Sequence, residues 1–298
     1  MVTIGVAQPS VPARNPGGVD RGAAGGYVLG RRTPDGGFSF YRTPSWGVEE
    51  PNAPDTLAAL ESLRLLFLEV PAPHETVGWL RSLQDGDGSF ATLTIGWAAL
   101  RALGVLGVAP SRSPLAWLGE VAGRAARPDV ARSWRSAIVD ASRLLELGEL
   151  LSSPIPAASS LVERLLDDAD DPDGGWARPE LDLETFAIAD RLAGLAGLDG
   201  ADRDRAARYV RTCEDPVFGF RLSPSAAATS VGTLRGGLWL LRSTGLAGRH
   251  LDAARRQLVM LQGPDGGFAA RHRALSTLQD TWRGLDAARL LDELQEAS

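Results

Sequence analysis

Carboxylates at the starts of predicted helices are the residues best suited to chemistry. Asp55, Glu184 and Asp280 each stand directly before a threonine where an apolar stretch begins, and Asp140 lies about two turns inside another such stretch. A carboxylic acid that burial or a like-charged neighbour keeps protonated can donate a proton in catalysis. We therefore take these four residues as candidate catalytic acids.

Each of these acids also has a structural interpretation. An acid in the first turn of a helix commonly caps the helix or stabilises its dipole, and this would account for Asp55, Glu184 and Asp280. Asp140 could pair with Arg135 or Arg143, because an unpaired carboxylate in a buried helix is costly. The residues alone leave both interpretations open.

A denser acidic stretch, DADD at 168–171, has the spacing DxDD. It lies at the end of a predicted helix, just before the turn DPDGGW, where acidic side chains are easily solvated. We interpret it as a solvated helix end and predict that Asp170 can be replaced with little effect on function.

Composition excludes several other kinds of chemistry. All 31 basic residues are arginine, so the chain has no lysine for Schiff-base, pyridoxal phosphate or P-loop chemistry. The single cysteine, Cys213, and three scattered histidines do not form a set of tetrahedral zinc ligands. We expect the protein to need neither a metal ion nor another cofactor.

Charge and hydropathy limit the partners. The formal net charge is −6, and no basic stretch is interleaved with aromatic residues, which argues against nucleic acid as a partner. No apolar run reaches the roughly 18 residues of a membrane span, and the N-terminus lacks the pattern of a signal peptide. We expect a cytoplasmic protein, and the sequence does not predict its oligomeric state.

The elements that must position the acids belong to an internal repeat, marked by a glycine-rich turn that closes with an aromatic residue. The turns are TPDGGF (33–38), DGDGSF (85–90), DPDGGW (171–176), DPVFGF (215–220) and GPDGGF (263–268). Neighbouring turns are 44 to 52 residues apart, except for one interval of 86, which has room for a degenerate unit at 114–151. Six repeats therefore fill the chain.

Each repeat is predicted to be a helical hairpin. In the last repeat an amphipathic helix (250–262) precedes the turn and a second helix (276–291) follows it. In the second repeat the helix after the turn (92–107) is apolar nearly all round, which indicates burial on most sides. Hairpins with one buried helix each favour an all-α fold, a closed α/α toroid of six hairpins.

The boundaries of this prediction follow from the turns. The whole chain, 1–298, would be one domain that begins with a short irregular segment, about 1–20. The expected inner helices are 53–67, 92–107, 132–148, 181–197, 229–243 and 276–292.

The repeat resembles that of the prenyltransferase and squalene-cyclase family. The matching stretches are LRSLQDGDGSF (80–90), VMLQGPDGGF (259–268), APDTLAAL (53–60) and QDTWRGL (279–285). Members of this family include protein prenyltransferase β subunits, squalene-hopene cyclases and class II diterpene cyclases. The resemblance covers roughly residues 25–295 and implies the toroid fold and an isoprenoid substrate.

The resemblance also implies a position for the catalytic acid. In class II cyclases a P-D-x-D-D-T stretch supplies the proton, and the stretch Pro51–Thr56 occupies this position here. Asn52 replaces the first Asp, Pro54 replaces the proton-donating middle Asp, and Asp55 alone is retained. Because proline cannot donate a proton, another acid must act if the chain is a cyclase, and Asp55 is our first choice.

Aromatic and arginine side chains are the candidate substrate-binding groups. Aromatic faces can stabilise carbocations and line apolar pockets, and plain core packing is the alternative for them. Arginines in loops beside helix starts could bind a diphosphate or carboxylate, or form a solvated rim. The candidates are Tyr41, Trp46, Trp97, Trp134, Phe186, Trp239, Trp282, Arg42, Arg221 and Arg271.

Three functions remain open. We predict a class II type isoprenoid cyclase, in which an acid starts the cyclisation of a polyprenyl substrate. A non-catalytic toroid that binds a prenyl chain or a protein partner is the first alternative. A zinc-independent prenyltransferase is the second. A lipid-like substrate would also favour peripheral contact with a membrane.

Overall fold

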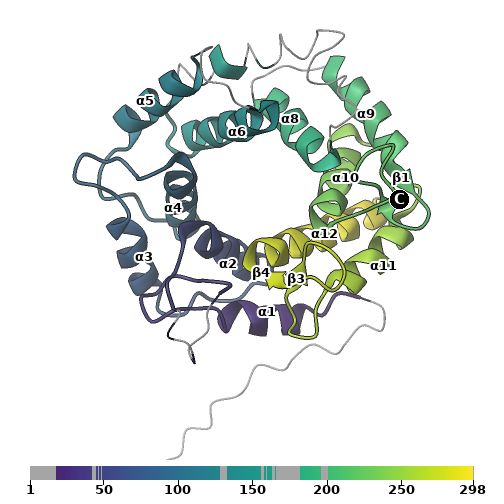
Figure 1. Cartoon of the computed structure of the whole chain (residues 1–298), viewed down its shortest axis with the longest axis horizontal. Coiled ribbons are helices and arrows are strands. Elements are labelled where there is room, and N and C mark those ends of the chain that lie inside the picture. The colour runs from purple at the N-terminus through teal and green to yellow at the C-terminus, as the bar shows by residue number, and fades with distance from the viewer. Residues whose placement is uncertain are drawn as a thin grey trace, which may run out of the picture.

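The computed structural model describes residues 18–41, 45, 47, 49–127, 133–155, 158, 160–162, 165, 182–195 and 201–297. This part of the chain is mostly helical, which confirms the predicted all-α class. In Figure 1, α2, α4, α6, α8, α10 and α12 surround the centre of the view, and α1, α3, α5, α9 and α11 lie outside them. The DADD stretch and the N-terminal segment before residue 18 lie outside the described residues.

The six predicted inner helices are all present, and each begins within two residues of its predicted start. Most of them start one or two residues late because a polar residue such as Thr92 or Ser230 caps the first turn through its side chain. The inner helices are α2 (Ala53–Leu65), α4 (Leu93–Val105), α6 (Trp134–Leu150), α8 (Leu183–Leu195), α10 (Val231–Thr244) and α12 (Leu278–Glu296).

The outer helices are shorter and amphipathic. In α11, for example, Ala254, Leu258 and Leu261 are buried at helical spacing while Asp252 and Arg256 are exposed. This pattern follows from packing one face on an inner helix and leaving the other in water. The outer helices are α1 (Arg21–Leu29), α3 (Pro73–Ser82), α5 (Leu115–Ala125), α9 (Ala201–Cys213) and α11 (Leu251–Leu261).

Short strands flank two of the glycine turns, although the sequence indicated only loops there. β1 (Glu214–Asp215) pairs antiparallel with β2 (Gly219–Phe220), and β3 (Phe268–Ala269) pairs with β4 (Ser276–Thr277). Phe220 and Phe268 are almost completely buried. The aromatic residue that closes each turn must reach the core, and this brings its backbone alongside a neighbouring segment.

The glycine turns join each repeat to the next one. Gly36 and Gly266 have positive φ angles of 90° and 88°, which favour glycine. A Cβ atom on Gly36 would lie 2.7 Å from the backbone of Glu75 in α3, and one on Gly266 would lie 2.2 Å from the carbonyl oxygen of Ala23 in α1. Only glycine therefore allows the turn to rest on the first turn of the following outer helix.

Glutamine side chains complete these junctions. The Gln84 amide accepts a hydrogen bond from the backbone N of Arg112 and donates one to its carbonyl oxygen. Gln262 makes the same two bonds to Asp20, which belongs to the other end of the described chain. Successive inner helices pack on one another from α2 to α12, and α12 packs on α2. The last repeat thus meets the first through contacts of the same kind that join two consecutive repeats.

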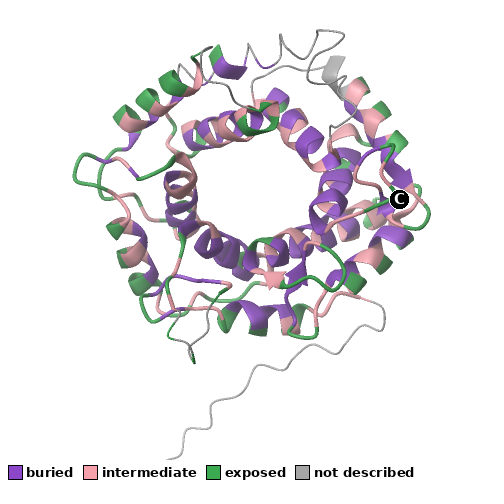
Figure 2. Ribbon diagram, in the orientation of Figure 1, coloured by how far each residue is buried: buried purple, intermediate pink, exposed green. Residues whose placement is uncertain are grey.

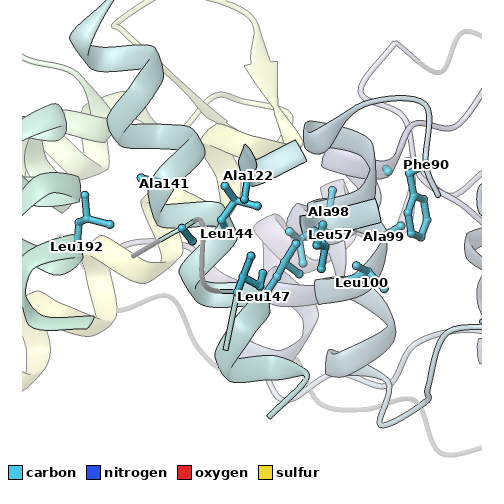
Figure 3. Packing of buried hydrophobic residues seen from close by; sticks show 14 of the residues in the cluster. Leu57, Phe90, Ala98, Ala99, Leu100, Ala122, Ala141, Leu144, Leu147 and Leu192 are labelled. Atoms are coloured by element: carbon cyan, nitrogen blue, oxygen red, sulfur yellow. The ribbon is translucent and has the colours of Figure 1, made fainter. Parts of the chain in front are cut away.

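Apolar side chains fill the space between the two layers of helices. Figure 2 shows buried residues concentrated on the inner helices and on the facing sides of the outer ones. One cluster joins α2, α4, α5, α6 and α8, with Leu57, Leu100, Leu144 and Leu192 among its members (Figure 3). Small residues on inner helices seat the aromatic rings of the turns: a Cβ on Gly284 would lie 2.4 Å from the ring of Phe268. At such positions the small residues serve close packing.

Candidate functional site

Asp55 lies at the start of α2 in a capping arrangement set by its neighbours in sequence. Asn52 is the N-cap residue, and its Oδ1 accepts a hydrogen bond from the backbone N of Asp55 at 2.8 Å. Pro54 occupies the first turn, where helices tolerate proline. Thr56 Oγ1 accepts from the backbone N of Phe38 at 2.9 Å and so ties the glycine turn to α2. Asp55 itself is 1% exposed.

Neutral groups hold the Asp55 carboxyl. Its Oδ2 accepts hydrogen bonds from Asn52 Nδ2 at 2.8 Å and from the backbone N of Phe40 at 3.0 Å. Within the described part of the chain, no arginine pairs with this carboxyl and no group donates to its Oδ1. The side chains of Phe40 and Trp282 pack on the apolar cluster beside this helix start. A buried carboxyl without a cationic partner is the kind of group that can serve as a proton donor.

Asp280 occupies the corresponding place at the start of α12, but with a different partner. Thr277 caps this helix, accepting from the backbone N of Asp280 at 2.9 Å, and its hydroxyl lies 2.9 Å from Asp280 Oδ2. Arg283 Nη1 donates to Asp280 Oδ1 at 3.2 Å. Asp280 is therefore held in an ion pair, unlike Asp55.

Glu184 at the start of α8 is also paired with arginines. Its Oε1 lies 3.2 Å from Arg283 and its Oε2 lies 3.9 Å from Arg135. Its carboxylate sits over Gly232 of α10, where a Cβ atom would come within 2.6 Å of it. This glycine leaves the room that lets Arg283 reach across α10 to α8. These ion pairs link the inner helices α6, α8 and α12.

Asp140 in α6 pairs with Arg143 at 3.5 Å, as one of its two structural interpretations proposed. The other partner, Arg135, pairs instead with Asp182 at 2.6 Å. Asp140 also lines a small cavity of about 170 Å³ together with Phe90 and Trp117. This volume is below the roughly 300 Å³ at which ligand pockets typically begin.

Two of the candidate aromatic residues, Trp97 and Trp282, each contact charged side chains. Trp97 Nε1 donates to Glu146 at 2.9 Å, and the guanidinium of Arg143 lies 5.1 Å from the centre of its ring. Arg235 lies 4.6 Å from the ring of Trp282 in the same way. In both cases a guanidinium lies over one face of the ring.

The other aromatic candidates differ in exposure. Phe186 is 2% exposed and stacks on Tyr209 of the outer helix α9, with ring centres 4.3 Å apart. Trp134 and Trp239 are partly buried against the core. Tyr41 is 63% exposed and lies beside Phe40. Trp46 lies outside the described residues.

Two of the three arginine candidates lie among the described residues. Arg221 pairs with Asp215 of its own hairpin at 3.4 Å. Arg271 is exposed in the loop before β4. Arg42 lies outside the described residues. A common anion site formed by these arginines therefore stays a prediction.

A ladder of alternating charges was not predicted from the sequence. Glu61, Arg101, Glu146 and Arg191 each lie four residues before the end of α2, α4, α6 and α8. Arg101 bridges the two buried glutamates, at 2.9 Å from Glu61 and 2.8 Å from Glu146, and Arg191 lies 3.2 Å from Glu146. The signal in the sequence is a Glu and an Arg that alternate at the same helix position in consecutive repeats.

A second set of ion pairs joins α10 to α12. Asp286 lies 2.7 Å from Arg235 and 2.6 Å from Arg289. Burial alone would raise the pKa of Asp286, but the two guanidinium groups hold it below its ordinary value. The inner helices are thus joined by charged side chains as well as by apolar ones.

The described residues also bear on metal binding and membrane insertion. No group of three or more His, Cys, Asp or Glu side chains there is arranged to hold a metal ion. Cys213 is buried, and burial raises the pKa of its thiol to about 11. The described helices include none that is both long enough and apolar enough to cross a membrane.

Comparison with known proteins gives one informative similarity. No protein-family model matches the chain. The chain is 28% identical over 223 residues to a drimenyl diphosphate synthase from Streptomyces showdoensis. The match covers 66% of this chain and 40% of the synthase, so the chain spans less than half of that relative's length.

Proposed function

We propose that the protein is a terpene cyclase-like enzyme that starts the cyclisation of a polyprenyl diphosphate with a carboxylic acid, and that Asp55 is this acid. The similarity to a drimenyl diphosphate synthase supports the class of reaction and the diphosphate substrate. The observation that carries the choice of residue is the Asp55 carboxyl, 1% exposed and held by neutral donors alone among the described residues.

The other candidate acids are less suited to this role. Arg283 pairs with both Asp280 and Glu184, and Arg143 pairs with Asp140. A neighbouring cation stabilises the carboxylate and opposes the protonated form that a general acid needs. Asp55 is the one of the four candidates that forms no ion pair with a described residue.

The chemistry of the first step balances without another reactant. The O–H bond of Asp55 breaks as its proton forms a C–H bond with one carbon of an alkene in the isoprenoid chain. The other alkene carbon becomes a cation, which the next double bond attacks, and Asp55 remains as a carboxylate. The final cation then loses a proton to water, which leaves a cyclic isomer of the substrate with the diphosphate retained, and Asp55 regains a proton from solvent.

The proposed architecture is a closed α/α toroid of six hairpins that forms a single domain. The contact of α12 with α2 supports closure of the inner layer. The two hydrogen bonds between Gln262 and Asp20 support it in the outer layer, because they match those between Gln84 and Arg112. In this arrangement Asp55 lies close to the junction between the last repeat and the first.

A direct assay tests the proposal. The protein is incubated with farnesyl and geranylgeranyl diphosphate, and the products are dephosphorylated and identified by mass spectrometry. We expect a cyclic isomer from the native protein and none from Asp55→Asn, whose amide keeps the shape of the side chain. A product that Asp55→Asn forms at the native rate would exclude Asp55 as the acid.

A non-catalytic binding protein is the second candidate. Two observations favour it: Pro54 stands where the resembling cyclases have their proton donor, and ion pairs join the inner helices. A binding protein would retain a prenyl diphosphate without changing it. Equilibrium binding with no product from either diphosphate would support this function over the first.

A further inference from the structure

The two oxygens of the Asp55 carboxyl are in different surroundings. Asn52 Nδ2 and the backbone N of Phe40 both donate to Oδ2, at 2.8 and 3.0 Å, and no described group donates to Oδ1. The orientation of the Asn52 amide is fixed, because its Oδ1 accepts from the backbone N of Asp55 at 2.8 Å. A backbone N–H can only donate, so the amide oxygen must face it and the NH₂ group must face the carboxyl.

This arrangement decides where a proton can reside. An amide NH₂ and a backbone N–H have no lone pair to offer, so neither could accept a hydrogen bond from a proton on Oδ2. A protonated Asp55 that keeps both contacts must therefore carry its proton on Oδ1. Oδ2 would then be the carbonyl oxygen, which both donors continue to satisfy.

We propose that Asn52 is a positioning residue that fixes Asp55 through Oδ2 and reserves Oδ1 for the proton that is transferred. The inference rests on the proposed function of Asp55 as the acid. It gives Asn52 two separate roles: its amide oxygen caps α2, and its NH₂ group orients the carboxyl.

The start of α12 shows why an asparagine matters. There the Thr277 hydroxyl caps the helix and also contacts Asp280 Oδ2, while Arg283 occupies Oδ1. A hydroxyl can donate or accept, so it does not by itself assign the proton to one oxygen. At Asp55 the donors are fixed and Oδ1 is left open.

Two substitutions separate the capping role from the orienting one. Asn52→Gly removes the NH₂ donor without adding charge, and glycine is a tolerated N-cap residue. Asn52→Thr supplies a cap and a hydroxyl that can reach the carboxyl, as Thr277 does in α12. Thr277→Gly is the matched control, because it removes the same cap from a helix whose acid is paired with Arg283.

We expect Asn52→Gly to lower kcat at least about tenfold with KM almost unchanged, and to alter the pH profile of kcat, because the acid loses its orientation. Asn52→Thr should restore the melting temperature but leave kcat at least about tenfold below the native value, because its hydroxyl can also accept a proton from Oδ2. Thr277→Gly should lower the melting temperature about as much as Asn52→Gly and leave the pH profile unchanged. A native kcat and pH profile in Asn52→Gly, or in Asn52→Thr, would overturn the proposal.

Infrared spectroscopy tests the contact between Asn52 and Asp55 without requiring catalytic activity, so its outcome is separate from the test of the proposed function. The difference between the native spectrum and that of Asp55→Asn identifies the bands of the Asp55 carboxyl. Asn52→Gly should shift these bands and Thr277→Gly should not; unchanged bands in Asn52→Gly would contradict the contact with Asn52. Shifted bands in a protein that converts no prenyl diphosphate would uphold the positioning and reject the cyclase function.

Discussion

The starts of α2 and α12 share one arrangement of backbone hydrogen bonds and differ in the residues that contact the aspartate side chain. In both, the side chain of the N-cap residue accepts a hydrogen bond from the backbone N of an aspartate. The threonine after that aspartate accepts one from the backbone N of a phenylalanine in the glycine turn. Three residues after the aspartate, α12 has Arg283 where α2 has Ala58. Arg283 pairs with Asp280, whereas no described residue forms an ion pair with Asp55. One repeat thus holds its acid in an ion pair, and the other holds its acid with neutral donors.

The two helix starts should differ most in how much kcat depends on their aspartates. Asp55→Asn should lower kcat by about a hundredfold or more, because general acids typically contribute that much. Asp280→Asn should change kcat less than about fivefold, since its carboxylate is already paired. Steady-state kinetics on both variants measure the contrast. Equal losses in the two variants would show that the pairing with Arg283 does not distinguish the acids.

Packing of the two helices should differ almost as clearly. Gly284 of α12 lies against Phe268 so closely that a Cβ would be 2.4 Å from its ring, whereas α2 has Ala59 at the same place in its repeat. Gly284→Ala should therefore lower the free energy of unfolding by about 1–3 kcal/mol. Urea denaturation measures the change.

A glycine in open space provides the control for this substitution. Gly119 lies in α5 with no atom within 4 Å of its Cβ position. Gly119→Ala should raise the free energy of unfolding by up to about 1 kcal/mol, since alanine favours the helix. Destabilisation by both substitutions to a similar extent would mean that α12 is not tightly packed at Gly284.

Removing the distinguishing arginine should have a smaller effect. Arg283→Ala leaves Asp280 without its cation and Glu184 with Arg135 at 3.9 Å. Arg283 is 31% exposed at its side chain, so solvent limits the loss to about 1–2 kcal/mol of unfolding free energy. Arg124→Ala, at an exposed pair with Glu120, should cost less than about 0.5 kcal/mol. If urea denaturation gave the same loss of unfolding free energy for both variants, the ion pair between Arg283 and Glu184 would not stabilise the fold.

The smallest expected effect is on the pH dependence of stability at alkaline pH. Tyr27 donates to the carbonyl oxygen of Ser276, just before α12, and burial raises the pKa of Tyr27 to about 12. Because the folded protein holds this proton more tightly than the unfolded chain does, the stabilisation is complete below pH of about 10 and is lost as the pH rises to about 12. Tyr27→Phe should make the pH dependence of stability shallower in this window. An unchanged slope would place the titration elsewhere.

The fold was more predictable from the sequence than the site. Helical periodicity and the glycine turns predicted all six inner helices, because they report which face of a segment is buried. The pairing of Asp140 with Arg143 was among the local interpretations, whereas the capping residues of α2 and α12 are Asn52 and Thr277 rather than the aspartates that follow them. They depend on residues within one or two turns of each other.

Contacts between distant segments were not predictable in the same way. The pair of Arg283 with Glu184 depends on the space over Gly232, and the stacking of Phe186 on Tyr209 depends on how α8 meets α9. A periodic pattern says that a face is buried but does not say which helix covers it. For the same reason, the loop positions of Arg42, Arg221 and Arg271 do not say whether their side chains meet at one site.

The central claim is that a buried acid at Asp55 protonates an isoprenoid alkene, and the mass of a product formed in D₂O tests it most directly. A carboxylic acid exchanges its proton with solvent, so acid-initiated cyclisation should place one deuterium in each product molecule, at the carbon that receives the proton. The native protein should give a cyclic product one mass unit heavier than that formed in H₂O, and Asp55→Asn should give none. A cyclic product without deuterium, or a deuterated one from Asp55→Asn, would contradict the account.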